Sequence, residues 1–547
     1  MRKNALRRSV SAVSLVFQNR EMRLLQLSWG VQSLSLWAFA IALGVYAFDV
    51  GGATAVGVAG LVRLLPGALA APFGGLVGDR FSRRAVLVVS TFASAALIGA
   101  AAAAVAVGAP AAIVFALAGL TTVAICPYIP AEGALMPLVA RSPQELSAAN
   151  VAHSVMDNAG FLAGALVSGA LLATTSPETV FTVAAFAGVL STLLLAAMHR
   201  DARPDYVAES SGKVLGEMAK GVRVLAGDSS LRLVTVALTL MVFIEGAADV
   251  LGVIVALDLL DLGQGAVGWL NGAWGIGALL GSAALAVLLQ RGQLAAGIAI
   301  GCLLMGGFMA LPGLWVVAVA GYLAFLGMGA GYTFVEVAGR TMLQRIGSDE
   351  TLARALGVIE TSRFAAMALG SIAVPALIAL FGIRGSLIAL GALLPLFALL
   401  RWSALSSLEI GPPVEEDRFR LLRDHPIFAP LPIAMLERLS HDLITVTPTA
   451  GEAIVTQGET GERFYLIASG EVEIHVDGAL RHRSCAGDCF GEIALLNDVP
   501  RTATVVAASG CELLALERRH FVGAVTGHLR SDQAAASVAE ERIALLP

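Results

Sequence analysis

One stretch near the C-terminal end combines residue types that could bind a phosphorylated sugar. It reads FGEIALLNDVPRTATV and covers residues 490–505. Gly491 permits close backbone approach, and a short helix after it would present N–H groups to an anion. Arg501 supplies a planar fork of donors for a phosphate, and Glu492 can accept a hydrogen bond from a ribose hydroxyl. The pattern predicts a phosphate and sugar site, and the alternative is a surface ion pair worth under about 1 kcal/mol.

A second set of residues places charge within long apolar stretches. A charge at membrane depth is costly and usually faces a cavity or an opposite charge, so each one is a functional candidate. Glu245 and Asp249 lie four residues apart on one helix face, where two carboxylates in a low dielectric favour holding a proton. That suits a proton-coupling site; alternatively, arginines neutralise the acids in fixed pairs. The candidate coupling or substrate residues are Arg63, Asp157, Glu245, Asp249, Glu360 and Arg363.

A third pattern lies at a boundary between two apolar stretches. The sequence GGLVGDRFSRR, residues 74–84, joins a glycine-rich helix end to one aspartate and three arginines. The glycines let backbones pack closely, and the charges can pair across a helix junction. A simple topology signal is the alternative interpretation of this arginine-rich loop.

The composition around these residues indicates a membrane protein. Of the 547 residues 57% are hydrophobic and 14% charged, and the mean hydropathy is +0.79. Soluble proteins are about 45–50% apolar. Apolar stretches fill residues 24–402, whereas residues 406–547 have an ordinary globular composition. The net charge of −5 is diffuse and does not indicate a nucleic-acid partner.

The N-terminal residues and the cysteines add little chemistry. Residues 1–23 are basic but lack the apolar core and cleavage site of a signal peptide, so we expect a cytoplasmic arm. The five cysteines are scattered, which favours structural thiols in a reducing compartment over disulfides or a metal site.

The apolar stretches predict twelve transmembrane helices. Their expected ranges are 24–48, 52–77, 84–107, 111–139, 145–174, 177–198, 230–258, 265–289, 293–311, 314–344, 350–381 and 384–403. The longest break divides them six and six, as a transporter made of two related halves requires. Residues 132–145 resemble residues 336–350, with Glu132 matching Glu336 and Arg141 matching Arg345, which supports an internal repeat.

The basic residues orient these helices. They gather in alternate breaks, with Arg384 as the exception on the other side. By the positive-inside rule both termini are therefore cytoplasmic, and we expect a multi-pass protein of the inner (plasma) membrane. The residues that carry this signal are Arg80, Arg83, Arg84, Arg141, Arg200, Arg203, Lys213, Lys220, Arg223, Arg232, Arg291 and Arg345.

With twelve predicted spans, residues 74–84 resemble the signature motif of the major facilitator superfamily. The resemblance implies an all-α fold of six plus six helices, in which this loop gates the change between outward-facing and inward-facing states. Ser82 departs from the glycine that is usual in the family. The matching positions are Gly75, Asp79, Arg80, Arg83 and Arg84.

Three segments narrow the resemblance to one branch of that superfamily. Residues 63–84, 137–155 and 221–234 look like the branch that contains enterobactin and multidrug exporters. Its proton-coupled members often have a Gly-Pro pair in the fifth span. Here Gly160 and Gly164 keep the small-residue spacing, but Ala165 stands where proline is expected. The departure weakens the prediction of proton antiport, whereas close helix packing is still expected.

The C-terminal part has a different pattern. Apolar positions between residues 421 and 439 are spaced for one helix face, and from Ile444 β-branched and polar residues alternate between glycine turns. This predicts an α+β domain in which flanking helices accompany a β-roll, or jelly-roll. We expect a linker at 404–420 and the domain at 421–547.

This domain resembles the cyclic nucleotide-binding domain family, whose phosphate cassette has the order and spacing of residues 490–505. The resemblance implies that Glu492 binds the 2′-hydroxyl, Arg501 the cyclic phosphate, and that Thr502 lies near the base. Gly491, Ile493 and Ala494 would lie along the cassette backbone. The base stays open between cAMP and cGMP, with cAMP favoured as the commoner ligand, and the last helix would act as a lid.

Together these patterns predict a proton-coupled exporter of small drug-like or siderophore-like molecules, regulated by a cyclic nucleotide. Its expected domains are an arm (1–23), helices one to six (24–198), a central loop (199–229), helices seven to twelve (230–403) and the nucleotide domain. We expect no enzyme activity and no cofactor, since no Gly-Lys-Ser/Thr phosphate loop is present. The expected partners are the lipid bilayer, a small-molecule substrate and the nucleotide.

Several other functions compete with this prediction. A nucleotide-gated channel would need an arginine-rich voltage sensor and a carbonyl-lined filter, and the sequence has neither. A membrane receptor derived from a transporter, a lipid transporter, or a tail that serves only for docking all stay open.

Overall fold

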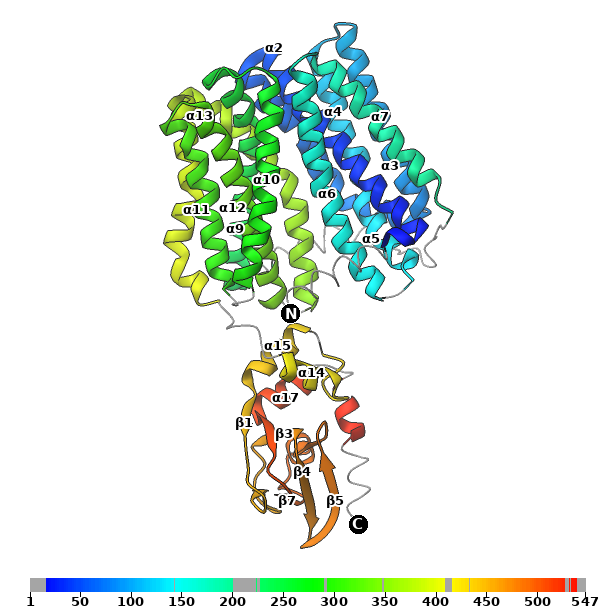
Figure 1. The fold of residues 1–547 in the computed structure, drawn as a ribbon, viewed down its shortest axis with the longest axis vertical. Coiled ribbons are helices and arrows are strands. Elements are labelled where there is room, and N and C mark those ends of the chain that lie inside the picture. Colours follow the sequence, from blue (N-terminus) through cyan, green and yellow to red (C-terminus); the bar gives the residue numbers. More distant parts are fainter. Residues whose placement is uncertain are drawn as a thin grey trace. The chain divides into compact units, whose positions relative to one another are not determined.

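The computed structural model describes residues 16–141, 143–199, 223, 227–289, 293–346, 349–408, 416–431, 433–526, 531 and 533–538 (Figure 1). Contacts along the chain separate two compact units, Met1–Ile410 and Gly411–Pro547. In its described part the first unit is helical, and the second combines helices with β-strands.

The first unit is an assembly of long helices. Its first half contains α2 (Arg20–Arg80), α3 (Arg83–Ala106), α4 (Ala111–Ile125), α5 (Tyr128–Val139), α6 (Pro143–Leu172) and α7 (Pro177–Ala196). The second half contains α9 (Ser229–Ile254), the π-helix η1 (Val255–Leu259), α10 (Gly265–Leu289), α11 (Leu294–Leu314), α12 (Ala318–Ile346) and α13 (Asp349–Ser406).

Two of these helices contain a glycine break. In α2 the backbone leaves helical geometry at Gly51 and Gly52, where Gly52 has φ 59°. In α13 it does so at Gly382, with φ 68° and ψ 175°. Glycine adopts these positive φ values without the steric cost that a Cβ would bring. Each helix therefore consists of two straight segments joined at a tight turn.

Long apolar helices make the first unit a polytopic membrane body. Nine helical stretches among the described residues are long and apolar enough to cross a membrane. Two of them, Arg20–Ala71 and Ser362–Ser406, have 52 and 45 residues, whereas one crossing needs about 20. These two contain the glycine breaks. The predicted helical membrane body is thus confirmed, and the number of twelve spans stays a prediction.

Close backbone contacts join the two halves. Helix α2 packs on α13 and α6 packs on α10, and the second pair lies side by side at the centre of Figure 1. A Cβ on Gly268 of α10 would overlap the backbone of Gly169 in α6. Within the first half, a Cβ on Gly160 would lie 2.5 Å from the Gly30 carbonyl oxygen, and one on Gly164 2.8 Å from that of Leu34. The close packing predicted at Gly160 and Gly164 is confirmed.

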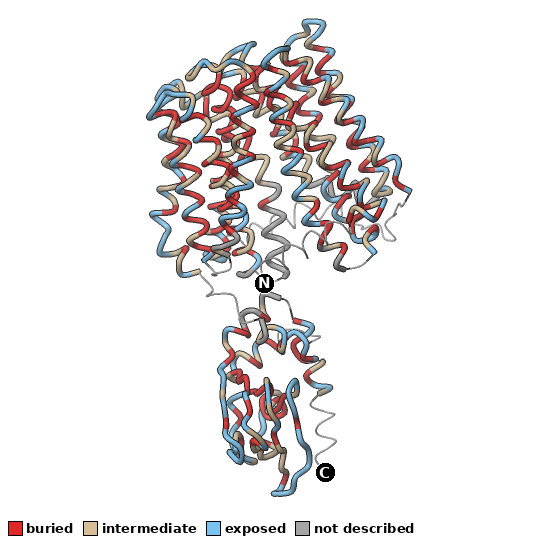
Figure 2. Tube along the Cα trace, in the orientation of Figure 1, coloured by how far each residue is buried: buried red, intermediate tan, exposed pale blue. Residues whose placement is uncertain are grey.

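Burial follows this packing. Figure 2 shows buried residues along the inner faces of the helices and exposed residues along the outer faces. Many exposed residues are large and apolar, among them Leu69, Phe186 and Leu400. An apolar outer surface suits hydrocarbon, since lipid imposes no cost on it.

The second unit contains two antiparallel four-stranded sheets. One has the order β1 (Ile444–Val446), β8 (Glu512–Glu517), β3 (Arg463–Ser469) and β6 (Cys489–Phe490). The other has the order β2 (Ala453–Val455), β7 (Thr504–Ala507), β4 (Glu471–Val476) and β5 (Ala479–Cys485). The short helix α16 (Glu492–Leu496) follows β6. The predicted α+β domain is confirmed.

Alternation along β3 builds two cores from one strand. Tyr465 and Ile467 belong to the core shared with the second sheet, whereas Phe464 and Leu466 point to the other side. There they meet the helices α14 (Glu416–Asp424), α15 (Ile433–Asp442) and α17 (Arg518–Thr526). The rings of Phe464 and Phe521 stack with centroids 4.5 Å apart. The sheets are therefore anchored to a helical layer.

A glycine pair in the membrane body tests the role of backbone contact. A Cβ on Gly277 of α10 would overlap the Leu326 carbonyl oxygen of α12, whereas one on Gly307 of α11 would meet nothing within 4 Å. We expect Gly277→Ala to lower the unfolding temperature in detergent, because overpacking costs about 1–3 kcal/mol. Gly307→Ala should leave it unchanged or raise it, because alanine is the better helix former. Equal effects of the two substitutions would contradict this account.

Candidate functional site

The second unit contains a cavity of about 430 Å³ beside α16. Its polar side is formed by residues that follow β6 and by residues 501–503. Its apolar side is formed by Val455, Ile474 and Val505. The structure brings all six predicted cassette residues to this one cavity. They are Gly491, Glu492, Ile493, Ala494, Arg501 and Thr502.

Arg501 is buried at the wall of the cavity. Its guanidinium donates to the carbonyl oxygens of Gly491 at 3.0 Å and Arg463 at 2.6 Å. Burial lowers the pKa of Arg501, and the neighbouring Tyr465 and Glu492 oppose that shift. Since arginine stays protonated in proteins, the cavity wall has a fixed positive charge with donors beyond these two bonds. An anion is the complementary ligand.

Glycine creates the space for this guanidinium. Gly491 has φ 90°, and a Cβ there would lie 2.5 Å from Nη1 of Arg501. A Cβ on Gly461 would lie 3.2 Å from Cζ of the same guanidinium. Two positions must therefore lack a side chain before Arg501 can reach the cavity wall.

Glu492 is 1% exposed and lines the same cavity. It is the first residue of α16, directly after Gly491. A buried carboxylate beside an arginine can accept a hydrogen bond from a hydroxyl group of a ligand. The cavity thus pairs a cation with an acceptor, as the sequence predicts, and the roles of the individual residues stay predictions.

Sequence reasoning missed several further lining residues, among them four from outside the cassette. Arg481 and His482 come from β5, His425 from the turn after α14, and Val538 from the C-terminal segment. Folding of the β4–β5 hairpin brings the first two beside the cassette. Of the C-terminal segment predicted to act as a lid, Val538 lines the cavity. Residues 539–547 lie outside the described part of the chain.

The membrane body contains a balanced cluster of charges, which we call the arginine cluster. Arg63 lies 3.5 Å from Asp249, and Arg363 lies 3.3 Å from Glu245 and 3.5 Å from Glu336. The full cluster comprises the carboxylates of Glu245, Asp249 and Glu336 and the guanidiniums of Arg63, Arg340 and Arg363. The pairing of the two acids with Arg63 and Arg363, which the sequence left as the alternative to a coupling site, is the arrangement observed. The coupling role of these residues stays a prediction.

The members of this cluster that come from α12 were not predicted. Glu336, Arg340 and Tyr332 join it from α12, and the Arg363 guanidinium lies 2.5 Å from the Tyr332 hydroxyl. Their spacing of four residues along one helix face is the signal that could have found them. Arg63 of α2 and Asp249 of α9 also join the two halves. The side chain of Glu360 lies outside the described residues.

The space beside the cluster is small. One cavity of about 50 Å³ touches Arg63 and Asp249, and another of about 20 Å³ touches Glu245 and Asp249. Aromatic rings, among them Trp37 and Trp274, line them. Drug-sized sites measure about 300–1,000 Å³. In this conformation the two cavities have room for a few water molecules and not for a drug-sized molecule.

Asp157 lies apart from the arginine cluster. Its Oδ1 accepts a hydrogen bond from the Ser33 hydroxyl at 3.1 Å. One turn earlier on α6, Nδ1 of His153 lies 3.1 Å from Oε1 of Glu132. The sequence indicated Glu132 only as part of the repeat, and His153 was not a candidate.

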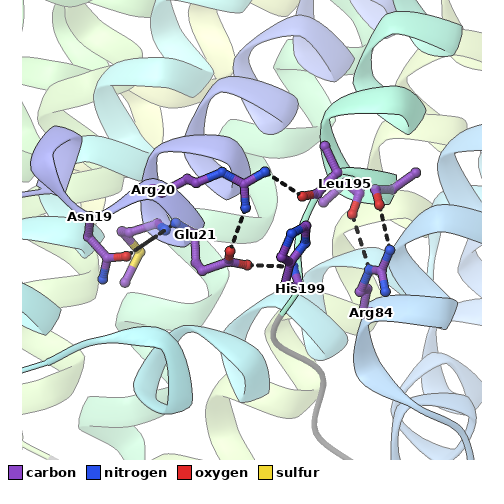
Figure 3. Close-up of polar contacts among 9 residues, drawn as sticks. Asn19, Arg20, Glu21, Arg84, Leu195 and His199 are labelled. Carbon is purple, nitrogen blue, oxygen red and sulfur yellow. Dashed lines mark hydrogen bonds and ion pairs between the residues drawn. The ribbon is translucent and has the colours of Figure 1, made fainter.

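The segment predicted to be a gating motif, residues 74–84, has described side chains only at its C-terminal end. Arg84 donates from Nε and Nη2 to the carbonyl oxygens of Leu195 and Ala196 at the end of α7, as Figure 3 shows. Beside it, Arg20 donates to the carbonyl oxygen of Ala197. Arginines here satisfy carbonyls at a helix C-terminus, where positive charge is stabilising.

Two other motif positions also have contacts in the structure. Arg83 donates to the Ala134 carbonyl oxygen at 2.9 Å, so the motif is linked to α5 as well. Ser82, the departure from the family pattern, caps α3 by accepting from the Ala85 N–H. Gly75, Asp79 and Arg80 belong to α2, but their side chains lie outside the described residues.

Sequence profiles of two families match the chain. The profile described as Major Facilitator Superfamily matches residues 27–338, and the one described as Cyclic nucleotide-binding domain matches residues 446–527.

Curated relatives match the second unit. A cAMP-dependent protein kinase regulatory subunit of Yarrowia lipolytica is 47% identical over 72 residues, which are 13% of this chain and 19% of that protein. One from Colletotrichum orbiculare is 36% identical over 115 residues, 20% of this chain and 29% of that protein. The chain thus spans less than a third of each relative.

Among solved structures, the first unit is similar to the nucleoside transporter NupG. The TM-score is 0.60 at 13% identity, and the match covers 71% of this chain and 100% of that one. At this identity the likeness concerns the fold alone.

The pair that joins the halves can be tested by neutralising each partner. Arg63→Gln or Asp249→Asn leaves one charge unpaired in apolar surroundings, whereas the double variant removes both. We expect each single substitution to lower stability in detergent by up to about 3 kcal/mol, and the double variant to lie closer to the native chain. Chemical denaturation of the three variants measures this. A double variant whose loss equals the sum of the two single losses would show that the charges do not interact.

Proposed function

The chain belongs to the Major Facilitator Superfamily, and on this basis we propose that it exports small amphipathic molecules in exchange for protons under control of a cyclic nucleotide. It is a transporter-type membrane protein with a cyclic nucleotide-binding domain, and not an enzyme. The finer parts of the proposal concern the nucleotide, the topology, the substrate and the control.

The observation that carries nucleotide control is the cavity beside α16. There Arg501 provides a fixed cation and Glu492 a buried acceptor in one cavity, the pair that a cyclic phosphate and a ribose hydroxyl need. cAMP is the proposed nucleotide. The similarity to regulatory subunits named for cAMP supports this choice over cGMP.

The proposed topology has twelve spans, six in each half, with both termini in the cytoplasm. The two glycine breaks support it, since each divides a helix too long for one crossing into two segments. Helix α10 has 25 residues and supplies a further span. The basic residues of alternate loops support the orientation, and the inner (plasma) membrane is the proposed location.

Export of amphipathic molecules is supported by the site between the halves. The small cavities at Asp249 are lined by Trp37, Trp274 and Asn271. Aromatic rings with few polar groups suit ligands that are partly apolar. The resemblance of residues 63–84 to exporters favours outward transport. The arginine cluster would then hold the halves together in one state and open in another.

Control by the tail is proposed to act through linkage. A ligand shifts the equilibrium between two transporter states only by its difference in affinity for them, typically about 1–3 kcal/mol. That difference corresponds to about 5–150-fold in the equilibrium constant. Nucleotide binding would therefore change the transport rate without any chemical step.

Nucleotide binding is tested by calorimetric titration of cAMP and cGMP into the full-length protein. We expect the native chain to bind cAMP, and Arg501→Ala to remove detectable binding, because the cavity then lacks the buried cation beside Glu492. Arg483→Ala is the matched control, since Arg483 is an exposed residue of β5 that pairs with Glu473 at 2.6 Å outside the cavity. Native binding of neither nucleotide would reduce the tail to a docking domain.

Control of transport is tested with reconstituted vesicles that carry a proton gradient and ethidium as probe. We expect cAMP to change the native efflux rate about 5-fold or more, and to have no effect on the Arg501→Ala variant. A shortened chain that ends at Ser406 should transport without any response to cAMP. An identical response in the native and Arg501→Ala proteins would contradict nucleotide control.

A further inference from the structure

A polar cluster in the first half is separate from the arginine cluster, and we call it the α5–α6 cluster. It joins Glu132 of α5 to His153 and Asp157 of α6. Oε1 of Glu132 lies 3.1 Å from Nδ1 of His153, the hydrogen bond that this carboxylate makes among the described residues. Glu132 is 2% exposed and His153 27%. A deeply buried carboxylate therefore depends on one imidazole for its neutralisation.

Aromatic rings enclose this cluster on one side. The Trp29 ring of α2 stacks on His153 with centroids 5.2 Å apart and on Tyr128 with centroids 4.9 Å apart. The indole N–H of Trp29 is buried and interacts with the Asp157 carboxylate. The Trp29 side chain is thus a polar neighbour of Asp157 as well as a ring that stacks on His153.

Charge balance distinguishes the two clusters. Among the described residues, the arginine cluster has three carboxylates and three guanidiniums, and these are together neutral when every carboxylate is ionised. Arginine does not release its proton, so this cluster needs no further proton. The α5–α6 cluster has two carboxylates and one imidazole. With the imidazole protonated and both carboxylates ionised its net charge is −1, and one more proton makes it neutral.

Charges on neighbouring helices do not remove this imbalance. Arg363 of α13 acts on Asp157 through space, but its close contacts are with Glu245, Glu336 and Tyr332. Arg83 of α3 is bound to a carbonyl oxygen of α5. From α2 the cluster receives the neutral Ser33 hydroxyl and the Trp29 indole.

We propose that Glu132, His153 and Asp157 form the proton-binding site of this transporter. The site takes one proton from water, which converts one carboxylate to a carboxylic acid, and it releases the same proton in the other transporter state. This inference rests on the proposed proton-coupled function. It places coupling in the first half and leaves Glu245 and Asp249 to fixed ion pairs.

The cluster lies where protonation can influence helix packing. The Ser33 hydroxyl bonds both the backbone carbonyl oxygen and the carboxylate of Asp157, each at 3.1 Å. A Cβ on Gly160 would lie 2.6 Å from Cβ of Ser33, so α2 and α6 are in close contact at this point. A change in the charge of Asp157 therefore acts directly on the contact between α2 and α6. If the proton affinity of Asp157 differs between two arrangements of the α2–α6 contact, proton binding shifts the equilibrium between these arrangements.

A fixed structural pair of Glu132 and His153 is the competing explanation. Such a pair would stay in one protonation state over the working pH range and would stabilise the contact of α5 with α6. A measurement of bound protons separates the two explanations, whereas a loss of stability on substitution would not.

The test is a pH titration of the full-length chain in lipid vesicles, followed by the infrared carbonyl band of protonated carboxylic acids. We expect a band that changes with pH in the native chain and is lost in the double variant E132Q/D157N. Both substitutions are isosteric, and an amide at position 157 still accepts from Ser33. The matched variant E245Q/D249N should retain the band.

The outcomes are distinct. Persistence of the band in E132Q/D157N, its loss in E245Q/D249N instead, or no titrating band in the native chain overturns the proposal. If the double variant does not fold, the single substitutions E132Q and D157N carry the test, and the band must fall in at least one. Proton-driven ethidium efflux is measured separately, so a titrating cluster without efflux would refute the proposed function and not the proton site.

Discussion

Charged side chains among the apolar helices of the first unit are stable only where an opposite charge or a hydrogen-bond donor meets them. Neither lipid nor a dry helix bundle replaces the water that these groups lose. Arg363 meets this requirement by contacting Glu245, Glu336 and Tyr332 together. These contacts join α9, α12 and α13 at one point in the apolar interior.

The same requirement connects the two halves. Arg63 of the first half pairs with Asp249 of the second, and glycines at the α6–α10 contact bring the backbones together. Separating an ion pair in apolar surroundings leaves two unpaired charges and costs free energy, whereas a glycine contact has no side chain to interlock. Alternation between two states would then need the ion pair to separate or to exchange partners, with the glycine contact allowing movement at low cost.

In the second unit, the buried charge that needs an opposite charge lies at a candidate ligand site. Arg501 is buried and donates hydrogen bonds to two carbonyl oxygens. Carbonyl oxygens are uncharged, so these bonds do not neutralise the charge of the guanidinium. A bound anion would complete the neutralisation, so an electrostatic gain is available for nucleotide binding. Gly461 and Gly491 make the arrangement possible, because a side chain at either position would crowd the guanidinium.

Much of this organisation is present in the local sequence. Apolar stretches predict the membrane helices to within a few residues, since a run of about 20 apolar residues has few other stable environments. The alternation after Ile444 predicts strands, and the spacing of Glu492 and Arg501 predicts a cavity with an acceptor and a cation. All these signals act over short distances along the chain. Composition and periodicity alone therefore determined the two kinds of unit and the character of the second site.

Only the tertiary structure decided which charges meet. From the sequence, Asp157, Glu245 and Asp249 were equal candidates. The position of an acid within an apolar stretch can be read from the sequence, but the residue that it pairs with cannot. In the structure Glu245 and Asp249 each pair with an arginine. Asp157 instead accepts a hydrogen bond from Ser33, one helix turn from His153. It also brings the β5 residues to the nucleotide cavity through a hairpin. Pairings between distant segments depend on helix rotation and strand register, which packing of the whole unit determines.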